Sequence, residues 1–407
     1  MPKTNYDVCI VGAGAAGIAT ASSLLKRKPT LNIALIDASA SHVYQPGWTL
    51  VGAGIFNAKD TTRSMASVIP KGVTWVQQAA VEFKADSNSV VLDNDDVIEY
   101  KALVVAPGLK LDFDAIEGLT QTLGQHGVTS NYRYDLAPYT WQLVQQLKQG
   151  SALFTQPPMP IKCAGAPQKA LYLSADWWQQ KGLLNNIKVA FHNAGGVLFG
   201  VPAYVPALMD TVEGYGIDLQ LNSQLVKVDG PTQTATFNLI KDGAVVGQET
   251  KHFDMLHVCP PQTAHDFMRG QPIADAAGWV NVTPDTLQNP HYSNVFGLGD
   301  GANTPNAKTA AAVRKQAPVV AQNILSLLAH KPLTAIYDGY GSCPLTVSRR
   351  RIVLAEFGYG GKLLPTFPTW FLDGTKPTRR AWWLKAKAMP SIYWNLMLKG
   401  REWLTKP

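Results

Sequence analysis

The 407-residue sequence contains little cysteine and little charge, and it has no long apolar run. Four cysteines in a chain of this length exclude a disulfide-rich secreted scaffold. Charged residues make up 16% of the chain and hydrophobic residues 46%, which excludes a disordered protein and leaves room for two or three domains. No stretch approaches the roughly 18 uninterrupted apolar residues of a spanning helix. Contact with a membrane is therefore expected to be peripheral.

The charge balance and the N-terminal sequence indicate which targeting segments and which partners to expect. We expect no targeting segment, because the first predicted strand begins at about Tyr6. The net charge of +7 favours an anionic partner, for which a small ligand, a membrane or a nucleic acid would qualify. We expect no nucleic-acid partner, because the basic residues are local and no binding motif accompanies them. We also expect no metal site.

Residues 5–37 carry a dinucleotide-binding pattern of strand, glycine-rich loop, helix and strand. Gly12 permits the tight turn, Gly14 lets the backbone approach a pyrophosphate, and Gly17 lets helix and strand pack closely. The N-terminus of the helix attracts the diphosphate. Asp37 ends the second strand, where it can accept hydrogen bonds from ribose hydroxyls. The pattern predicts an FAD or NAD site.

Later segments favour FAD over NAD. Two predicted strands end in turns at Gly108 and at Asp300, and Asp300 is a candidate contact for the ribityl chain of FAD. The helix predicted to begin near Lys308 presents its N-terminus and a lysine, which would stabilise negative charge on a reduced flavin. We therefore expect a discontinuous FAD-binding domain formed by residues 1–110 and 275–335.

Residues 111–274 predict a second Rossmann-like domain. A strand, a helix and a strand are expected over residues 186–221, followed by a hairpin-type insertion. The loop of residues 192–200 lacks the G-x-G-x-x-G spacing, and Val197 and Phe199 place bulk where a pyrophosphate would lie. We expect this domain to keep the fold and to have lost its nicotinamide site.

Two cysteines lie in distinctive segments, Cys163 within 160–169 and Cys343 far downstream. Lys162 and Lys169 flank Cys163 and would supply the electropositive surroundings that a thiolate needs. Two thiols beside a flavin can pass two electrons into its ring. The alternative for Cys163 is a buried structural role. The remaining cysteines are expected to be structural: Cys9 and Cys259.

The C-terminal region, residues 336–407, ends in a segment rich in tryptophan and basic residues. Pro390 is predicted to divide this segment into two short amphipathic helices. Tryptophan suits the headgroup depth of a bilayer and Lys or Arg suits anionic lipid, so we expect a monotopic membrane surface. Packing on the domain and a dimer contact are the alternatives. The tryptophans concerned are Trp370, Trp382, Trp383, Trp394 and Trp403.

Together these features resemble the sulfide:quinone oxidoreductases of the flavin disulfide reductase superfamily, most closely the branch that includes the animal mitochondrial enzyme. The resemblance rests on residues 12–17, 44–54, 160–169, 275–279, 338–345, 354–357 and 389–394. It implies an α/β fold with two Rossmann-like domains and a C-terminal amphipathic helical membrane-binding region. It also implies that Cys163 and Cys343 form a redox pair beside FAD, with quinone between tail and flavin. The candidate quinone and membrane residues are Phe357, Trp382, Trp383, Tyr393 and Trp394.

The resemblance further implies the reaction. Hydrosulfide attacks the oxidised cysteine pair, Cys343 becomes a persulfide, and Cys163 passes two electrons to FAD and onward to membrane quinone. A small thiol or a second sulfide removes the sulfur. Residues 129–132 offer no cysteine for flavin attachment, so FAD is expected to bind non-covalently. We expect a peripheral enzyme on the cytoplasmic face of a bacterial inner membrane, and a homo-oligomer is compatible with the sequence.

Three other functions stay open. The first is an NAD(P)H-dependent flavin disulfide or quinone reductase, against which the degraded middle loop argues. The second is a sulfide dehydrogenase that passes electrons to a cytochrome subunit, for which the tryptophan-rich tail would be unnecessary. The third is a flavin redox sensor without turnover, which sustained quinone reduction would exclude.

Overall fold

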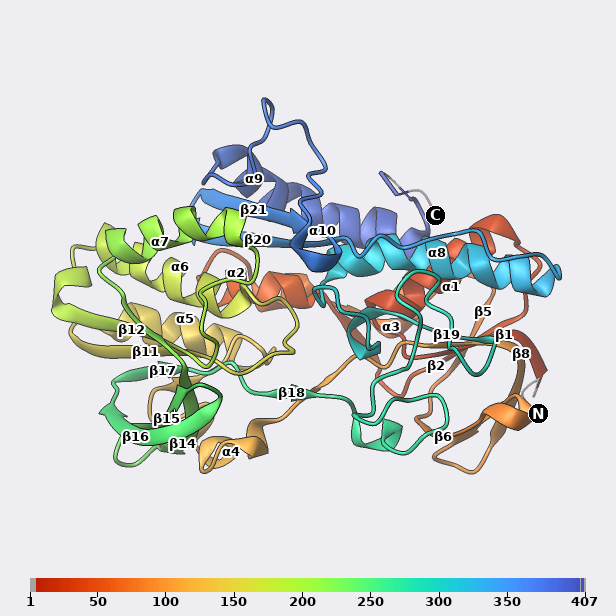
Figure 1. The fold of residues 1–407 in the computed structure, drawn as a ribbon, viewed down its shortest axis with the longest axis horizontal. Coiled ribbons are helices and arrows are strands. Elements are labelled where there is room, and N and C mark those ends of the chain that lie inside the picture. The colour runs from red at the N-terminus through yellow and green to blue at the C-terminus, as the bar shows by residue number, and fades with distance from the viewer. Residues whose placement is uncertain (1–4, 403, 406–407) are drawn as a thin grey trace.

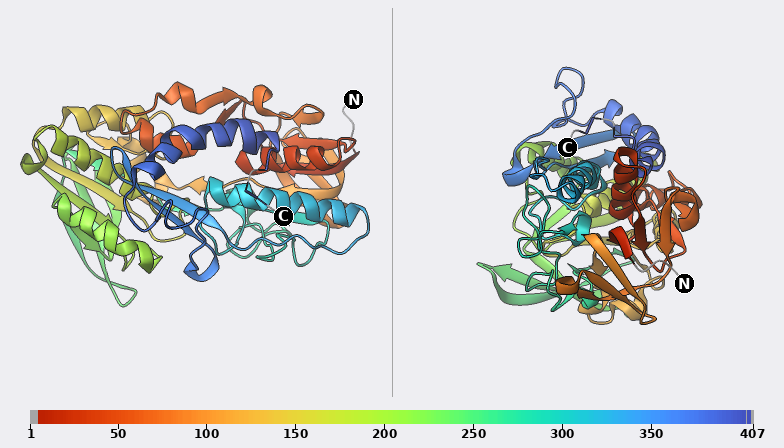
Figure 2. Two further views of the ribbon diagram at one scale, coloured as in Figure 1. Left: turned by 90° about the horizontal axis from the view of Figure 1, so that it is seen from above. Right: turned by 90° about the vertical axis from the view of Figure 1, so that its right-hand side faces the viewer.

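The computed structural model describes residues 5–402 and 404–405, and Trp403 of the predicted tail lies outside them. Two α/β lobes lie side by side, and the C-terminal segment runs across both (Figures 1 and 2). The predicted α/β fold with two Rossmann-like parts is confirmed. The proposed domain boundaries stay predictions.

The first lobe is built on a sheet of strand order β5-β2-β1-β8-β7-β6, with β19 paired to β8. Its centre is parallel, and β6 and β7 are antiparallel. Helices α1 and α8 pack against each other. The apolar residues of the central strands β1, β2 and β8 are buried in the core of this lobe. The elements are β1 (Asn5–Val11), α1 (Ala15–Arg27), β2 (Ile33–Ile36), β5 (Val73–Val76), β6 (Ala80–Lys84), β7 (Ser89–Leu92), β8 (Val97–Val105), β19 (Val295–Gly297) and α8 (Ala310–Leu328).

The second lobe has a parallel sheet of order β10-β17-β11-β12-β13. Its carboxyl edge faces the loop that carries Cys163. A three-stranded antiparallel sheet, β14-β15-β16, follows as the predicted insertion. The elements are β10 (Val128–Thr129), α5 (Ala137–Gln146), β11 (Gly150–Gln156), α6 (Ala166–Gln180), β12 (Ile187–Asn193), α7 (Val205–Gly214), β13 (Asp218–Leu221), β14 (Ser223–Asp229), β15 (Thr234–Lys241), β16 (Ala244–His252) and β17 (Met255–His257).

Short elements connect the lobes. An antiparallel hairpin of β20 and β21 places Cys343 opposite Ala355 and packs against α6. β3 pairs with β4, and β9 pairs with β18, which lies between the lobes (Figure 1). These elements are β3 (Ser41–Val43), α2 (Trp48–Val51), β4 (Thr62–Ser64), α3 (Met65–Val68), β9 (Lys110–Leu111), α4 (Leu119–Thr122), β18 (Gln262–Thr263), β20 (Gly341–Ser348) and β21 (Arg351–Phe357).

The C-terminal segment forms one helical run from Arg379 to Lys399, so the prediction that Pro390 divides it is wrong. Proline lacks an N–H and its ring clashes with the carbonyl four residues earlier. Wider π-type turns on both sides of Pro390 accommodate this clash without ending the run. The run comprises α9 (Arg379–Trp383), π-turns over 384–388, α10 (Met389–Ser391), π-turns over 392–396 and a 3-10 turn over 397–399. Among the helices of the described residues, none combines the length and apolarity needed to cross a bilayer.

Candidate active site

Two thiols from different parts of the fold meet in the interior. The Sγ of Cys163, in the loop before α6, lies 2.9 Å from the Sγ of Cys343 in β20. Both cysteines are free, and the two sulfurs are in close contact without the covalent separation of about 2.05 Å that a disulfide has. Cys343 is buried and Cys163 is partly exposed. The structure thus brings together the two cysteines that the sequence singled out.

The backbone around Cys163 explains how the two segments come so close. Cys163 has a φ of +86°, a left-handed conformation that costs a non-glycine residue about 1–3 kcal/mol and occurs mostly at functional sites. Gly165 follows at the start of α6. A Cβ at Gly165 would lie 2.1 Å from Leu345 and 2.8 Å from the sulfur of Cys343. Only glycine at this position lets β20 approach the cysteine loop.

The electrostatics divide the pair into a thiolate and a thiol. The hydrogen bond from Cys343 and the Lys169 ammonium, 3.1 Å from the sulfur, hold the pKa of Cys163 well below its usual value. The same hydrogen bond, together with burial, raises the pKa of Cys343 well above its usual value. Burial opposes the charge of Lys169, but the Cys163 thiolate outweighs it and raises the Lys169 pKa. Cys163 is therefore the sulfur that carries negative charge.

A second lysine reaches the thiol pair from the C-terminal run. Lys385 is 3% exposed and donates a hydrogen bond of 2.9 Å to the carbonyl of Pro46. Burial and the nearby Lys169 lower the pKa of Lys385 to about 7, and the Lys385 charge in turn favours the Cys163 thiolate. The basic residues of the tail were expected to suit anionic lipid, and for Lys385 this expectation is wrong, because its side chain is buried. No sequence signal separates this lysine from its exposed neighbours.

The predicted flavin contacts Asp300 and Lys308 lie beside the cysteine loop, since Lys162 and Lys308 form a bridge between their backbones. The Nζ of Lys308 donates to the carbonyls of Asp300 and Ala302, each at 2.8 Å. Burial lowers the pKa of Lys308 to about 8. Burial raises the pKa of Asp300, although Lys162 and Lys308 oppose the shift. Asp300, Lys308 and Lys162 therefore form a group of ionisable side chains beside the cysteine loop.

The fingerprint loop has the shape that a diphosphate requires. A Cβ on Gly12, whose φ is +99°, would lie 2.3 Å from the carbonyl of Ala106, and one on Gly17 would lie 1.9 Å from the carbonyl of Gly12. At Gly14 nothing lies within 4 Å, so this side is open. Asp37 accepts a hydrogen bond of 2.7 Å from the N–H of Ala13. The loop is therefore tight on its sheet side and open where a phosphate would approach.

A second turn adjoins this loop. Gly108 has a φ of +74° and open space on its side-chain face. A Cβ at Gly301, next to Asp300, would lie 2.8 Å from the carbonyl of Gly108. The two predicted FAD turns are thus in contact.

Buried polar atoms without partners among the described residues fit a flavin. Buried groups of this kind are expected to find their partners in a ligand or in water. Ser342 adjoins Cys343, and the side chain of Asn131 lies where a Cβ at Gly52 would be. A polar, planar ring has donors and acceptors for such groups. The unpartnered atoms include Trp48 Nε1, both amide atoms of Asn131, the Tyr132 hydroxyl, Gln316 Nε2 and the Ser342 hydroxyl.

The five predicted quinone and membrane residues are not brought together. Tyr393 and Trp394 are buried, each 4% exposed, in the core of the first lobe. Trp383 is 63% exposed, and Trp382 is partly buried against Leu354 and Leu173. Phe357 is partly buried with its ring 5.9 Å from that of Phe199.

The loop of residues 192–200, which follows β12, is held closed by hydrogen bonds among its own residues. The side chain of Asn193 accepts from the N–H of Gly195 and donates to the carbonyl of Val197, each at 2.9 Å. Phe199 is buried against Tyr204, whereas Val197 is 62% exposed. The amide of Asn193 thus occupies the N–H of Gly195, a backbone donor of the kind that a glycine-rich loop would offer to a diphosphate.

Comparison with known proteins gives the family. The model for pyridine nucleotide-disulphide oxidoreductases matches residues 6–144. The chain is 39% identical to the mitochondrial sulfide:quinone oxidoreductase of Mus musculus, over 98% of this chain and 87% of that protein. It is 40% identical to the one of Dictyostelium discoideum, over 99% and 88%. The solved sulfide:quinone oxidoreductase of Aquifex aeolicus has a similar fold, with a TM-score of 0.80, 21% identity, and coverage of 98% of this chain and 92% of that one. The chain belongs to the sulfide:quinone oxidoreductase family.

Proposed function

We propose that this enzyme oxidises sulfide to sulfane sulfur at Cys163 and Cys343 and passes the electrons through FAD to quinone. The observation that carries the residue assignment is the thiol pair itself, 2.9 Å apart, with the Lys169 ammonium 3.1 Å from the sulfur of Cys163. When bound, FAD would supply a group that accepts two electrons in its oxidised form and can pass them to quinone in its reduced form. The residues that would hold it are those of the fingerprint loop, Asp300 and Lys308.

The asymmetry of the pair selects the sulfur that sulfide attacks. In thiol–disulfide exchange the sulfur with the lower pKa is the better leaving group. Cys163 has the lower pKa, so attack of hydrosulfide on an oxidised pair breaks the bond toward Cys163 and leaves the new sulfur on Cys343. Lys169 stabilises the Cys163 thiolate that is released. A small thiol or a second sulfide then removes the terminal sulfur from the Cys343 persulfide.

FAD is proposed to bind non-covalently. Residues 129–132 contain no cysteine, and the remaining two cysteines are poor nucleophiles. Cys9 is fully buried in β1. Burial raises the pKa of Cys259 to about 12, so this thiol stays protonated. Release of the flavin by acid precipitation would test the proposal, because a covalent flavin would stay with the protein.

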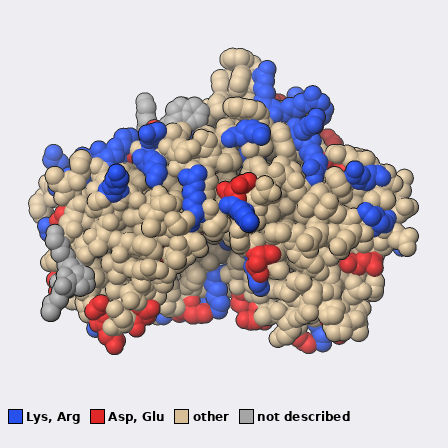
Figure 3. All heavy atoms as spheres, turned by 180° about the vertical axis from the view of Figure 1, so that it is seen from behind, with Lys and Arg blue, Asp and Glu red and all other residues tan. Residues whose placement is uncertain are grey.

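We also propose peripheral membrane binding through the loop before α9 and the outer face of that helix. Trp370 is 83% exposed, Trp383 63%, and Phe371 42%. This loop projects from the molecule above β21 (Figure 1), and Lys and Arg gather over the upper part of the rear face (Figure 3). Exposed aromatic rings beside basic side chains favour an anionic lipid surface. The neighbouring basic residues are Lys362, Lys376, Arg379 and Arg380.

Phe357 and Trp382 stay candidates for quinone contact, because both side chains are partly exposed. The cytoplasmic face of a bacterial inner membrane and a homo-oligomer stay predictions. So does the identity of the sulfur acceptor.

The decisive experiment separates the two half-reactions. Sulfide alone should bleach the flavin in a stopped-flow mixer, and a later addition of quinone should restore its absorbance. NADH and NADPH should not bleach it, because the loop after β12 is closed by Asn193. Rapid bleaching by either nucleotide would support the nicotinamide-dependent alternative instead.

A further inference from the structure

The last part of the C-terminal run, residues 389–402, packs inward on the nucleotide-binding lobe. Tyr393, Trp394 and Leu398 share the apolar core of β1 and α8, and Leu398 is fully buried. The ring of Trp394 lies under the guanidinium of Arg63, 4.2 Å away. This segment includes residues 389–394, one of the motifs on which the family resemblance rests, and the proposed membrane role does not explain that motif.

Two hydrogen bonds connect this segment to the fingerprint loop. The hydroxyl of Tyr393 lies 2.7 Å from Nε2 of His42, and Nδ1 of His42 lies 3.0 Å from the carbonyl of Ala13. His42 is 3% exposed, and burial lowers its pKa, so the imidazole is neutral. A neutral imidazole has one donor and one acceptor. Because the carbonyl of Ala13 can only accept, Nδ1 donates to it and Nε2 accepts from Tyr393.

The hydrogen bonds from Tyr393 through His42 to Ala13 fix the orientation of one peptide group. The carbonyl of Ala13 and the N–H of Gly14 belong to the same trans peptide, so they point in opposite directions. With the carbonyl held by His42, the Gly14 N–H is directed away from His42, at the N-terminus of α1 where a diphosphate would bind. Asp37 holds the other side of Ala13 through the 2.7 Å bond to its N–H.

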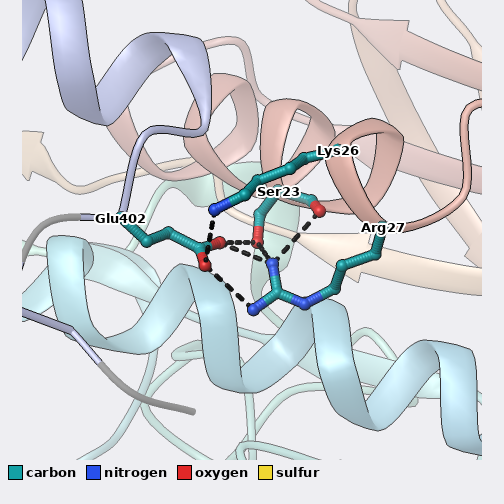
Figure 4. A network of polar contacts seen from close by, with 4 residues as sticks. All are labelled: Ser23, Lys26, Arg27 and Glu402. Carbon is teal, nitrogen blue, oxygen red and sulfur yellow. Dashed lines mark hydrogen bonds and ion pairs between the residues drawn. The ribbon is translucent and has the colours of Figure 1, made fainter.

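A second set of contacts fastens the same segment to α1 (Figure 4). The Glu402 carboxylate accepts hydrogen bonds from Ser23 at 2.6 Å and from both terminal nitrogens of Arg27 at 2.5 and 3.0 Å. Lys26 adds an ion pair at 3.4 Å. The side chain of Glu402 is 12% exposed, so water screens this bidentate pair less than an ordinary surface bridge.

A glycine lets the chain turn onto α1 between these anchors. Gly400 has a φ of +65°, and a Cβ there would lie 2.7 Å from the carbonyl of Ser22. The hydroxyl of Ser22 donates to the carbonyl of Leu398 at 2.8 Å. The segment is therefore anchored at His42 and at the C-terminal half of α1.

We propose that residues 389–402 form a latch that orients the diphosphate-binding loop, so that seating of the tail and binding of FAD stabilise each other. Tyr393, His42 and Glu402 are positioning residues that act through Ala13 and α1. The proposal rests on the proposed FAD site but not on sulfide or quinone chemistry. Such coupling is reciprocal. A change that loosens the packing of the tail weakens the binding of FAD, and loss of FAD loosens the packing of the tail.

The first test measures FAD release from the full-length holoenzyme after dilution, followed by the rise of flavin fluorescence. Tyr393→Phe keeps the ring and removes the hydroxyl. Loss of one buried hydrogen bond of this kind should speed release and raise the Kd of FAD by about 3- to 10-fold. The matched control is Asn395→Ala, an exposed residue of the same run, which should release FAD at the wild-type rate. Equal rates in both variants would overturn the proposal.

The second test uses the reciprocal effect. Trypsin should cut after Lys399 and Arg401 more slowly in the FAD-loaded protein than in the apoprotein, and Glu402→Gln should reduce this protection. A structural role alone would make the variants less stable with and without FAD to the same degree. Equal cleavage with and without FAD would contradict the latch. Neither test contains sulfide or quinone, so a failure of the proposed reaction would leave these results unchanged.

Discussion

The ammonium nitrogen of Lys169 lies 3.1 Å from the sulfur of Cys163, which in turn lies 2.9 Å from the sulfur of Cys343. Lys169 sits in the first turns of α6, just after the cysteine loop. The pKa of Cys163 is lowered and that of Cys343 is raised, so the negative charge of the pair is on Cys163. In the proposed function, this asymmetry makes Cys163 the leaving group and Cys343 the carrier of sulfur.

Cys163→Ser and Cys343→Ser should each reduce sulfide-driven quinone reduction to less than about one hundredth of wild type, because each thiol performs a step that a hydroxyl cannot. FAD should stay bound, since neither side chain belongs to the fingerprint loop. Turnover with a soluble quinone and the flavin spectrum check both statements. Cys259→Ala, which removes a buried and protonated thiol, is the control and should retain activity. Substantial turnover in either serine variant would remove that cysteine from the mechanism.

Lys169→Met should raise the pKa of Cys163. The wild-type thiolate forms well below the ordinary pKa of 9.0, so it is present at neutral pH and is lost only as the pH falls through the lowered value. Without the Lys169 charge this loss should occur at higher pH. Alkylation by iodoacetamide follows the thiolate fraction, and its rate at neutral pH should fall about tenfold for each unit by which the pKa rises above the assay pH.

Lys162→Met is the matched control for this experiment. Lys162 also flanks Cys163, but its Nζ donates to Gln45 at 2.7 Å. Its alkylation profile should stay closer to that of the wild type. The assignment would be wrong if the two profiles coincided.

Gly165→Ala should separate the thiols. The added Cβ would meet Leu345 at 2.1 Å and the Cys343 sulfur at 2.8 Å, so β20 must move. Overpacking of this kind destabilises a protein by about 1–3 kcal/mol. We expect a lower melting temperature and slower formation of the Cys163–Cys343 disulfide, measured by thiol titration during oxidation. Gly214→Ala, at a glycine of the same lobe that has open space around the added Cβ and no left-handed φ, should leave disulfide formation unchanged.

Trp370→Ser with Trp383→Ser should weaken binding to anionic vesicles while FAD stays bound. Both side chains are largely exposed, so their removal leaves the core intact. Cosedimentation should fall several-fold, and high salt should release the wild type only partly, because screening leaves the aromatic contacts in place. Truncation from Arg379 is a poorer test, since it removes the buried Tyr393 and Trp394. Unchanged cosedimentation would place the membrane surface elsewhere.

The parts of the site that are local in sequence could be predicted. The spacing of Gly12, Gly14 and Gly17 follows from one turn and one helix, and the structure has that turn. The segments of Cys163 and Cys343 were recognised for their composition, although the residues themselves hold no information about a distance of 2.9 Å across the fold. That distance depends on how a hairpin packs on α6.

The hairpin itself was missed for a physical reason. β20 contains Pro344, which is unusual inside a strand, together with buried hydroxyl residues. Most of β21 is buried on both faces, so its residues lack the alternation that marks a half-buried strand. Sequence composition was also insufficient to predict which side chains of the C-terminal segment are exposed. Composition predicted the interfacial character of Trp383, but it could not separate this residue from Trp394 or Lys385, whose side chains are buried by tertiary packing.

The thiol pair also joins distant parts of the chain. Cys163 and Cys343 are 180 residues apart, one in the second lobe and one in the hairpin that follows the first. In the oxidised state their bond would close a loop of that length, for which chain-entropy reasoning gives a stabilisation of about 5 kcal/mol. Each catalytic cycle would therefore fasten and release the tether between the lobes. The resting, oxidised enzyme should resist unfolding and proteolysis best, and between sulfide attack and reoxidation the lobes are joined only by packing and by the connecting segments of the chain.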